Sequence, residues 1–341
     1  MGTEIGPLLL REEVELERFS GKVIAIDGHN TLYQFLSIIR GPDGRPLTNK
    51  EGKITSHLSG LFYRTCNLLT FNIKPLFVFD GPPPKFKQKE IEVRRERRQE
   101  FYEKYEEALQ SGDLEEARKY AQGALSIDEY ILSSAKRLIT LLGLPIIEAP
   151  SEGEAQAAYL SKIGLAYAVA SQDYDSALFG APMIARNLAI SGRRKLPGKK
   201  AYVEVKPELV DVTKSLRELG ITLEQLVMIG ILVGTDFYEG VKGIGPKKAL
   251  SIVKSYSSLR EIFNELKIPF PEHLDEVYNF FLNPPVKHVD TINFSIPNKE
   301  KIISFLVEEN NFNEERVSNA LQPVMDMFSK RKTGLGKFMQ Q

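Results

Sequence analysis

The stretch EAPSEGEAQAAYLSKIGLAYAVASQDYD, residues 148–175, organises the rest of the chain. It carries two acidic pairs, Glu152 with Glu154 and Asp173 with Asp175. The pairs flank an expected helix at residues 152–162 and an expected buried strand at residues 165–170. If the helix packs on the strand, both pairs face one crevice, where four carboxylates cannot stay ionised without cations. The stretch therefore predicts a divalent-metal site.

Both pairs also have an ordinary structural interpretation. Ser151 and Glu154 have the spacing of a capping box, in which each side chain accepts a hydrogen bond from a backbone N–H of the first helical turn. Asp173 or Asp175 alternatively serves as the N-cap of a short helix at residues 176–179. The choice between these interpretations depends on the rest of the chain.

Two apolar runs upstream end in the same way. Residues 22–27 (KVIAID) and 75–80 (PLFVFD) each predict a buried strand that stops at an aspartate, Asp27 or Asp80, followed by glycine. Helical spacing of apolar residues separates and follows the strands, at residues 31–40, 56–71, 130–142 and 223–233. This alternation predicts an α/β fold with a mostly parallel central sheet flanked by helices.

In such a sheet, ligands bind beyond the carboxyl ends of the strands. Asp27, Asp80 and the pair Asp173/Asp175 all follow apolar strands. One aspartate after a strand is commonly a turn residue, but three strands that end this way favour a shared site. Asp236, beside Gly234 at the end of an expected helix, is either a further member or a turn aspartate.

A site made only of carboxylate oxygens selects Mg²⁺ or Mn²⁺ over zinc or copper. Two such ions activate a water molecule and stabilise both oxygens of an in-line phosphoryl displacement. Phosphodiester hydrolysis is therefore the expected reaction. A phosphomonoesterase would use the same metal site, so the substrate must be inferred from other residues.

Residues 85–98 (KFKQKEIEVRRERR) place many basic groups directly after the Asp80 strand. They open a stretch dense in lysine, arginine and glutamate, to about residue 128, that predicts two exposed helices with a turn at residues 111–113. Ion pairs between residues four apart explain such a run without a ligand. Its position beside the carboxylates favours a polyanion as the partner.

Residues 240–249 (GVKGIGPKKA) form a glycine turn that leads into a helix with proline at its first position. The segment fits neither a Walker A loop nor a dinucleotide-binding motif, because Pro246 and Lys248 stand where those patterns require lysine and glycine. Free N–H groups, Lys247 and Lys248 suit a duplex phosphate. The alternative is a helical connection without a ligand.

The composition adds few constraints. The 341 residues hold 45 Lys+Arg and 45 Asp+Glu, so net charge does not indicate a partner. The single cysteine, Cys66, excludes an internal disulfide, and four scattered histidines disfavour zinc. We find neither a signal peptide nor an apolar run long enough to span a membrane, and expect a soluble, intracellular protein without membrane partners.

Six motifs resemble those of the structure-specific 5′ nucleases, in the flap endonuclease branch and closest to its archaeal members. They are AIDGHNTLYQFL (25–36), TSHLSGLFYRT (55–65), KPLFVFDGPPP (74–84), EAPSEGEAQAAYL (148–160), QDYDSALFG (172–180) and GIGPKKAL (243–250). The resemblance covers residues 1–328. It implies a PIN-like nuclease fold with a helical arch, a helix-two-turn-helix DNA-binding element and a monomeric enzyme.

The resemblance also implies roles for individual residues. Seven carboxylates match the family's metal site for two Mg²⁺ ions, with Mn²⁺ as a substitute: Asp27, Asp80, Glu152, Glu154, Asp173, Asp175 and Asp236. Lys87 and Arg94 match the basic pair on the scissile phosphate. Other positions match DNA contacts: Gly2 at the buried amino terminus, Tyr33 as the stacking aromatic, Arg40, Arg64, Glu152, Gly234 and Asp236. Gly243, Gly245, Lys247 and Lys248 match the duplex-gripping loop, where K⁺ often binds.

The resemblance divides the chain into five parts. These are an N-terminal nuclease region (1–100), the arch within it (85–130), an internal nuclease region (130–225), a helix-two-turn-helix and C-terminal helical region (226–328), and a flexible tail (329–341). The tail departs from the family's sliding-clamp motif, because it keeps Leu335 and Phe338 but lacks the glutamine and one aromatic. Clamp binding through it is expected to be weak.

The expected function is removal of 5′ flaps from branched DNA, with 5′-3′ exonuclease activity, in Okazaki fragment maturation and DNA repair. An archaeal source would place the protein in the cytoplasm with the nucleoid. A junction-binding protein without catalytic activity is the rival from another class, and the intact acidic set argues against it.

Overall fold

The computed structural model describes residues 2–41, 44–121, 123–188, 192–195 and 202–338. Its centre is a seven-stranded sheet with the strand order β1-β9-β6-β5-β2-β3-β4. The strands are β1 (Leu10–Glu13), β2 (Val23–Asp27), β3 (Lys74–Phe79), β4 (Ile146–Glu148), β5 (Ala168–Ala170), β6 (Met183–Arg186) and β9 (Glu208–Asp211). Strands β6, β5, β2, β3 and β4 run parallel, and only β9 pairs with its neighbours in antiparallel fashion. The predicted mostly parallel sheet is therefore confirmed.

Alternate residues of the central strands enter two different cores. Ala25 of β2 and Leu76 of β3 join helices α6 (Gly153–Lys162) and α9 (Leu223–Val233) on one face of the sheet. The other face carries three further helices, α1 (Gly28–Ile38), α2 (Ser56–Thr70) and α5 (Glu129–Leu141). Because both faces are covered, the strands are apolar throughout, as the sequence indicated.

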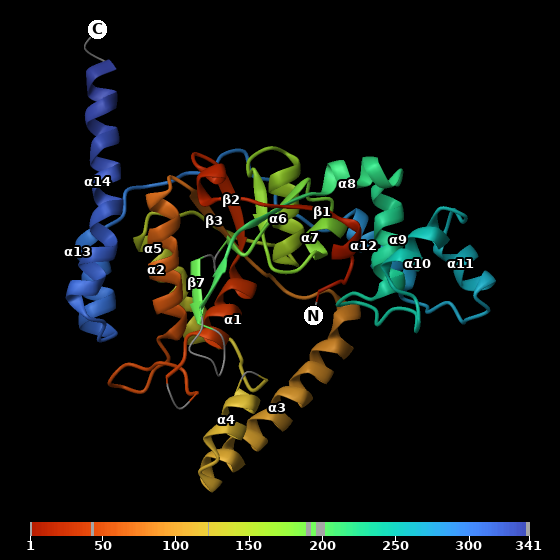
Figure 1. Ribbon diagram of the computed structural model, residues 1–341, viewed down its shortest axis with the longest axis horizontal. Coiled ribbons are helices and arrows are strands. Elements are labelled where there is room, and N and C mark those ends of the chain that lie inside the picture. Colours follow the sequence, from red (N-terminus) through yellow and green to blue (C-terminus); the bar gives the residue numbers. More distant parts are fainter. Residues whose placement is uncertain (1, 42–43, 122, 189–191, 196–201, 339–341) are drawn as a thin grey trace.

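Two helices project away from this body (Figure 1). They are α3 (Gln88–Ser111), which follows the 3₁₀ turn Lys85–Lys87, and α4 (Leu114–Ala121). Asp113 caps α4 by accepting a hydrogen bond of 2.9 Å from the Glu116 N–H. The two exposed helices and the turn between them lie where the sequence placed them.

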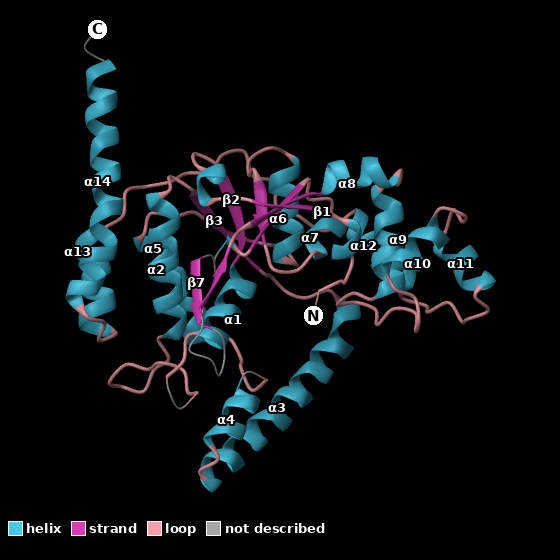
Figure 2. Ribbon diagram, in the orientation of Figure 1, coloured by secondary structure: helices cyan, strands magenta, loops and turns pink. Residues whose placement is uncertain are grey.

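The second half of the chain is mainly helical (Figure 2). The short helix α7 (Asp175–Leu178) precedes a two-stranded ribbon of β7 (Gly192–Lys195) and β8 (Tyr202–Val205). Besides α9, the helices after the ribbon are α8 (Val212–Leu219), α10 (Pro246–Val253), α11 (Leu259–Glu265), α12 (Leu274–Leu282), α13 (Lys299–Ile303), a π-helical turn (Ser304–Glu309) and α14 (Glu314–Phe338). Within the described residues, no helix combines the length and apolarity needed to cross a bilayer.

Helix α14 continues to Phe338, whereas a flexible tail was expected from residue 329. Residues 329–338 thus continue the helix that begins at Glu314, although Gly334 and Gly336 are weak helix formers. Residues 339–341 lie outside the described part of the chain.

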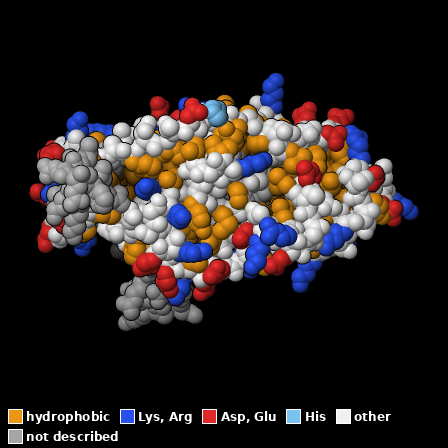
Figure 3. Space-filling view, turned by 90° about the horizontal axis from the view of Figure 1, so that it is seen from above, with side chains coloured by type: hydrophobic (Ala, Val, Ile, Leu, Met, Phe, Trp, Pro, Cys, Tyr) orange, Lys and Arg blue, Asp and Glu red, His pale blue; other side chains and the backbone are white. Residues whose placement is uncertain are grey.

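The surface mixes the two signs of charge. Figure 3 shows lysine and arginine side chains interspersed with aspartate and glutamate, with apolar groups between them. On this face, the mixture of charges fits the equal numbers of acidic and basic residues in the chain.

Candidate active site

Four of the expected site carboxylates lie at one edge of the sheet. Asp27 is the last residue of β2, Asp80 follows β3, and Asp173 and Asp175 follow β5. Strand β2 is the parallel neighbour of both β3 and β5, so the three strands end at the same edge. The structure brings these four side chains together as the strand pattern predicted.

The remaining three carboxylates come from helix ends on one face of this sheet. Glu152 and Glu154 lie at the first turn of α6, which packs against β2, β3 and β5. Asp236 follows α9 and its C-terminal residue Gly234, whose φ of 119° requires glycine. Asp236 lies in the tight turn between Thr235 and Tyr238, and its charge acts on Glu152 and Asp175, so it belongs both to a turn and to the cluster.

The capping-box interpretation of residues 151–154 was wrong. The N-cap of α6 is Glu152, which makes no side-chain capping bond, and the Ser151 hydroxyl is buried without a hydrogen-bond partner among the described residues. Instead, Asp80 Oδ1 accepts a hydrogen bond of 2.6 Å from the Gly153 N–H. A carboxylate from a neighbouring strand thus replaces the local serine, because the positive end of the helix favours a full negative charge.

The alternative for the second pair also fails. The N-cap of α7 is Tyr174, without a side-chain capping bond, and Asp175 is the first residue inside that helix. Asp175 is buried and its Oδ1 accepts a hydrogen bond of 2.7 Å from the Thr3 N–H. Its partner therefore lies near the start of the chain and not in the next turn.

Burial and mutual repulsion dominate the electrostatics of the cluster. Burial, together with the charges of Asp80, Asp173 and Glu152, raises the pKa of Asp27 to about 8, against a hydrogen bond from the Asn30 N–H. Burial also raises the pKa of Asp175 to about 7, although the Thr3 N–H opposes the shift.

Glu154 is affected in the same way. Its burial, with the charges of Asp175, Asp27 and Asp173, raises its pKa well above the ordinary value. Each of the seven carboxylates is thus repelled by at least one other member: Asp27, Asp80, Glu152, Glu154, Asp173, Asp175 and Asp236. The sequence-predicted set is one electrostatic unit.

Basic side chains of the projecting segment partly neutralise this unit. Lys87 Nζ lies 2.6 Å from Glu152 Oε2, and Arg94 Nη2 lies 2.6 Å from Asp236 Oδ1. Burial acts against ionisation of Asp236, but the Arg94 guanidinium outweighs it and lowers the pKa of that carboxyl. His29 Nδ1 accepts a hydrogen bond of 3.1 Å from the Asp80 N–H and so positions the end of β3 without adding charge. The free protein therefore supplies its own counter-charges to the outer carboxylates.

The donor set fits a hard divalent cation. All the groups of the cluster are carboxylates, and burial together with mutual repulsion raises the pKa values of Asp27, Glu154 and Asp175, so a cation would compensate negative charge there. Among the described residues, no three acidic, histidine or cysteine side chains already stand as ligands of one ion. The ion pairs of Lys87 and Arg94 give a physical reason, because they engage oxygens that a cation would use.

The expected DNA contacts lie on several elements of the fold. Gly2 lies against Asp173, and a Cβ added to Gly2 would come within 2.5 Å of the Asp173 Cβ, so a side chain there has no room. Tyr33 on α1 is 45% exposed, as a stacking surface requires. Arg40 donates to the carbonyl oxygens of Gly44 (2.7 Å) and Ala121 (3.1 Å), and thereby ties the end of α4 to the segment after α1. Arg64 lies on α2, where burial lowers its pKa.

The glycine loop lies further away, at the start of α10. Gly243 has a φ of 81°. Gly245 is the N-cap of α10 and, as a glycine, has no side chain to cap the first-turn N–H groups. Lys248 Nζ lies 3.5 Å from the Gly243 carbonyl oxygen, and Lys247 is on the same exposed turn. The first-turn N–H groups are thus accessible to an anion. The tail residues Leu335 and Phe338 belong to α14, and their side chains lie outside the described part of the structure.

Two residues that the sequence analysis did not identify support the cluster. Asn30 Nδ2 donates a hydrogen bond of 3.0 Å to Asp173 Oδ2, and the Ser171 hydroxyl donates one of 2.9 Å to Glu154 Oε1. Their positions in the sequence could have identified them, since Asn30 is three residues after the strand-ending Asp27 and Ser171 is two residues before Asp173. Polar residues so close to expected ligands are candidates for orienting them.

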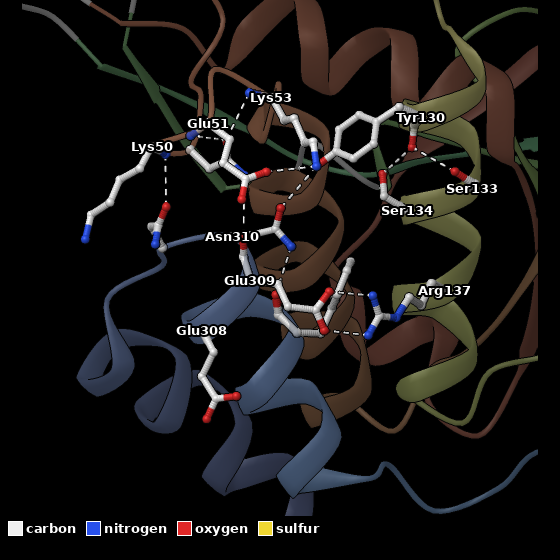
Figure 4. A pocket seen from close by; sticks show the side chains of 13 residues that line it. Lys50, Glu51, Lys53, Tyr130, Ser133, Ser134, Arg137, Glu308, Glu309 and Asn310 are labelled. Atoms are coloured by element: carbon white, nitrogen blue, oxygen red, sulfur yellow. Dashed lines mark hydrogen bonds and ion pairs between the residues drawn. The ribbon is translucent and has the colours of Figure 1, made fainter.

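A separate pocket of about 600 Å³ lies between the loop at residues 49–53, helix α5 and residues 305–311 (Figure 4). Arg137 donates two hydrogen bonds of 2.6 Å to Glu309, and Lys53 lies 2.9 Å from Glu51. In the adjoining core, His57 Nε2 lies 2.8 Å from the Ser134 hydroxyl. The sequence analysis did not identify this pocket, because its three walls are far apart along the chain.

Comparisons with known proteins match nearly the whole chain. The XPG N-terminal domain matches residues 5–101, which include Asp27 and Asp80, and the XPG I-region matches residues 143–236, which include the other five carboxylates. Among solved structures, flap endonuclease-1 from Methanococcus jannaschii has a TM-score of 0.74 and 40% identity, and the match covers 97% of this chain and 100% of that one. The catalytic core of Rad2 in complex with DNA substrate shares the fold, with a TM-score of 0.69 at 24% identity over 94% of this chain and 97% of that one.

Among curated proteins, flap endonuclease 1 of Archaeoglobus fulgidus is 55% identical over 333 residues, which are 98% of each chain. Such identity over nearly the full length of both proteins, together with the shared fold and the two matched XPG regions, shows that the chain belongs to the flap endonuclease 1 family.

Proposed function

We propose that the protein is a metal-dependent, structure-specific 5′-flap endonuclease with 5′-3′ exonuclease activity, which acts in DNA replication and repair. One observation carries the proposal. Seven carboxylates from strand ends and helix ends lie close enough to repel one another at one edge of the sheet, and Lys87 and Arg94 of the projecting segment pair with two of them. The name and activity of its relatives support the same reaction.

The seven carboxylates would hold two divalent ions, Mg²⁺ or in its place Mn²⁺. They are Asp27, Asp80, Glu152, Glu154, Asp173, Asp175 and Asp236. Bound ions would supply an activated water and neutralise charge on the phosphodiester. The protein contributes the site's shape: the strands fix Asp27 and Asp80, and the Thr3 N–H fixes Asp175.

Lys87 and Arg94 would exchange partners during the reaction. In the free protein they pair with Glu152 and Asp236, each at 2.6 Å. Once cations compensate these carboxylates, the two basic groups become available to the scissile phosphate. Charge-assisted hydrogen bonds to a phosphate are stronger than neutral ones, so they stabilise the developing negative charge.

The rest of the substrate would be recognised through its shape. Tyr33, which is 45% exposed, would offer a stacking face to the base at the cleavage site, and Gly2, Arg40, Arg64 and Gly234 would contact the DNA nearby. The first turn of α10, with Gly243, Gly245, Lys247 and Lys248, would grip duplex phosphates, with K⁺ as a further ligand of that turn. Phosphate contacts position DNA without reading its sequence, so selectivity would follow the branched geometry.

The partners follow from this role. We expect a monomer that acts on DNA carrying a 5′ flap, in the cytoplasm and close to the nucleoid. Leu335 and Phe338 on α14 are the candidate contacts for a sliding clamp. Since this tail lacks part of the family's motif, we expect weak clamp binding.

A 5′-labelled double-flap DNA tests the proposal directly. The unaltered protein should cut near the junction in Mg²⁺ and not in EDTA, and Asp175→Ala should abolish cutting. Gln322→Ala, which removes a hydrogen bond to Asp326 on α14, is the matched control and should behave like the unaltered protein.

Two outcomes contradict the proposal. Tight binding without cleavage in any divalent metal would identify a junction-binding protein. Equal hydrolysis of mononucleotides and branched DNA would identify a phosphomonoesterase, in which the projecting helices and the glycine loop have no role.

A further inference from the structure

Asn30 contacts carboxylates that belong to two neighbouring strands. It is the third residue of α1, and its backbone N–H donates a hydrogen bond of 3.0 Å to Asp27 Oδ1, which caps the helix. Its side-chain Nδ2 donates a hydrogen bond of 3.0 Å to Asp173 Oδ2. One residue thus sets the separation and orientation of the carboxylates that follow β2 and β5.

Gln34 fixes the orientation of the Asn30 amide. One helical turn after Asn30, Gln34 Nε2 donates a hydrogen bond of 2.6 Å to Asn30 Oδ1. Because this donor engages the amide oxygen, the amide nitrogen faces Asp173. The Gln34 Oε1 atom is buried without a partner among the described residues, so Gln34 serves here only as a donor. The three side chains form a directed chain from Gln34 through Asn30 to Asp173.

A neutral donor has a different effect from the cations of the projecting helices. Lys87 and Arg94 neutralise the carboxylates that they contact, and a metal ion must displace them. The Asn30 amide holds Asp173 without cancelling its charge, so the carboxylate remains attractive to a cation. Outer-shell partners of this kind fix the orientation of metal ligands and raise their affinity.

We infer that Asn30, held by Gln34, is a positioning residue that orients Asp173 toward Asp27 and thereby increases the affinity of the site for divalent cations. The inference deepens the proposed function and rests on it, since it takes the carboxylates as metal ligands. Gln34 contributes through Asn30 alone, because its described hydrogen bond is to that residue.

Calorimetric titration of the metal-free protein with Mn²⁺ measures the affinity without catalysis. Asn30→Ala should weaken Mn²⁺ binding by about 10-fold to 100-fold. On flap DNA, the Mg²⁺ concentration for half-maximal cleavage should rise by the same factor, whereas the rate at saturating Mg²⁺ should fall by less than about threefold, because the ligands themselves are intact. Gln322→Ala on α14 is the matched amide control and should leave both quantities unchanged.

A double-mutant cycle separates positioning from a general structural role. Gln34→Leu should weaken Mn²⁺ binding by about threefold in the unaltered protein, and should have no further effect in the Asn30→Ala background. Equal effects in both backgrounds would overturn the directed chain. If Asn30→Ala does not fold by circular dichroism, Gln34→Leu decides alone, and unchanged Mn²⁺ affinity overturns the inference.

The failures of the two proposals are distinguishable. If the unaltered protein cuts flaps only with metal, but Asn30→Ala matches it in Mn²⁺ affinity and in Mg²⁺ requirement, only the role of Asn30 is refuted. If the unaltered protein shows no metal-dependent cleavage, the proposed function fails, and the Mn²⁺ titration still reports whether Asn30 controls cation binding.

Discussion

Charged side chains gather both in the carboxylate cluster and in the pocket of Figure 4, but they are paired with opposite charges in the pocket and bound by neutral donors at the centre of the cluster. In the pocket, Arg137 pairs with Glu309 and Lys53 pairs with Glu51. In the cluster, the described hydrogen-bond donors to the innermost carboxylates are neutral: the N–H groups of Asn30 and Thr3, the Asn30 amide and the Ser171 hydroxyl. Buried acidic groups that receive only neutral donors are characteristic of functional sites, where a ligand compensates their charge. The contrast separates charge that serves stability from charge that serves function.

Removing one charge from each region should therefore have opposite effects on stability. Asp27→Asn keeps the helix cap, since asparagine also accepts the Asn30 N–H, but relieves repulsion. We expect flap cleavage to fall by about 1000-fold or more, because a metal ligand is lost, while the metal-free protein becomes more stable by about 1 kcal/mol. Glu309→Gln should instead destabilise the protein by about 0.2–1 kcal/mol, as for other exposed ion pairs.

Cleavage rates and thermal unfolding in EDTA measure both effects. If Asp27→Asn destabilises the metal-free protein as Glu309→Gln does, the expected difference between the two regions is contradicted, because the cluster would then be an ordinary stabilising network.

The basic residues of the projecting helices sharpen the comparison further. Lys87→Met removes the partner of Glu152, which lies 2.6 Å away. Cleavage at saturating Mg²⁺ should fall by about 100-fold to 1000-fold, because a cation near the scissile phosphate is lost. Mn²⁺ binding to the free protein should become tighter, since a competing cation has gone. Single-turnover kinetics measure the expected fall in cleavage, and calorimetry measures the expected rise in Mn²⁺ affinity. If the cleavage rate and the Mn²⁺ affinity both fall, Lys87 does not compete with the metal.

The pH dependence of stability should differ between the two regions. Asp27 and Asp175 have pKa values of about 8 and about 7, against an ordinary value of 3.8. Between pH 3.8 and the folded pKa, the folded chain keeps a proton on each of these two carboxyls, whereas the unfolded chain has released it. The stability that this proton gives the folded chain is complete below pH 3.8 and is lost as the pH rises to the folded pKa. From about pH 5 to pH 7 the metal-free protein should therefore lose stability, by on the order of 1 kcal/mol per pH unit for each carboxyl.

Unfolding in urea at several pH values checks this slope, and Mg²⁺ should flatten or reverse it. A metal-free protein that gains stability over the same interval would contradict the raised pKa values.

His57, next to the pocket, should give the opposite slope at lower pH. Burial lowers its pKa to about 4, from an ordinary 6.5. The unfolded chain binds the proton first, so stability falls as the pH drops from 6.5 towards 4, by on the order of 3 kcal/mol at most. The difference in stability between the unaltered protein and His57→Gln should shrink over this interval, and a constant difference would exclude the histidine as the cause.

The sequence predicted the parts of the fold that depend on local patterns. Apolar runs located β2 and β3, and the aspartates at their ends located the ligand edge. The order of the strands could not be predicted this way: β1 pairs with β9 from 200 residues further on, through Leu10 opposite Asp211, and nothing in either segment specifies its partner. Pairing of distant strands is decided by the packing of the whole sheet.

The candidate site shows the same limit at the level of single side chains. The seven carboxylates were identified because acidic residues after strands are conspicuous in a sequence. The groups that hold them were not, since the Gly153 N–H reaches Asp80 and the Asn30 amide reaches Asp173 only after folding. Ser151 has the right spacing for a cap, but a better acceptor from another strand took its place.

The ion pairs of Lys87 with Glu152 and Arg94 with Asp236 join the projecting helices to the body of the protein. A cation that displaces these two pairs must also loosen that junction. Thermodynamic linkage makes the relation reciprocal: whatever draws Lys87 and Arg94 away from the body increases cation affinity by the same factor by which cations favour their release. Binding of the DNA substrate and binding of divalent cations are then coupled. The apparent affinity for the DNA depends on the cation concentration, and the apparent affinity for the cations depends on the DNA concentration.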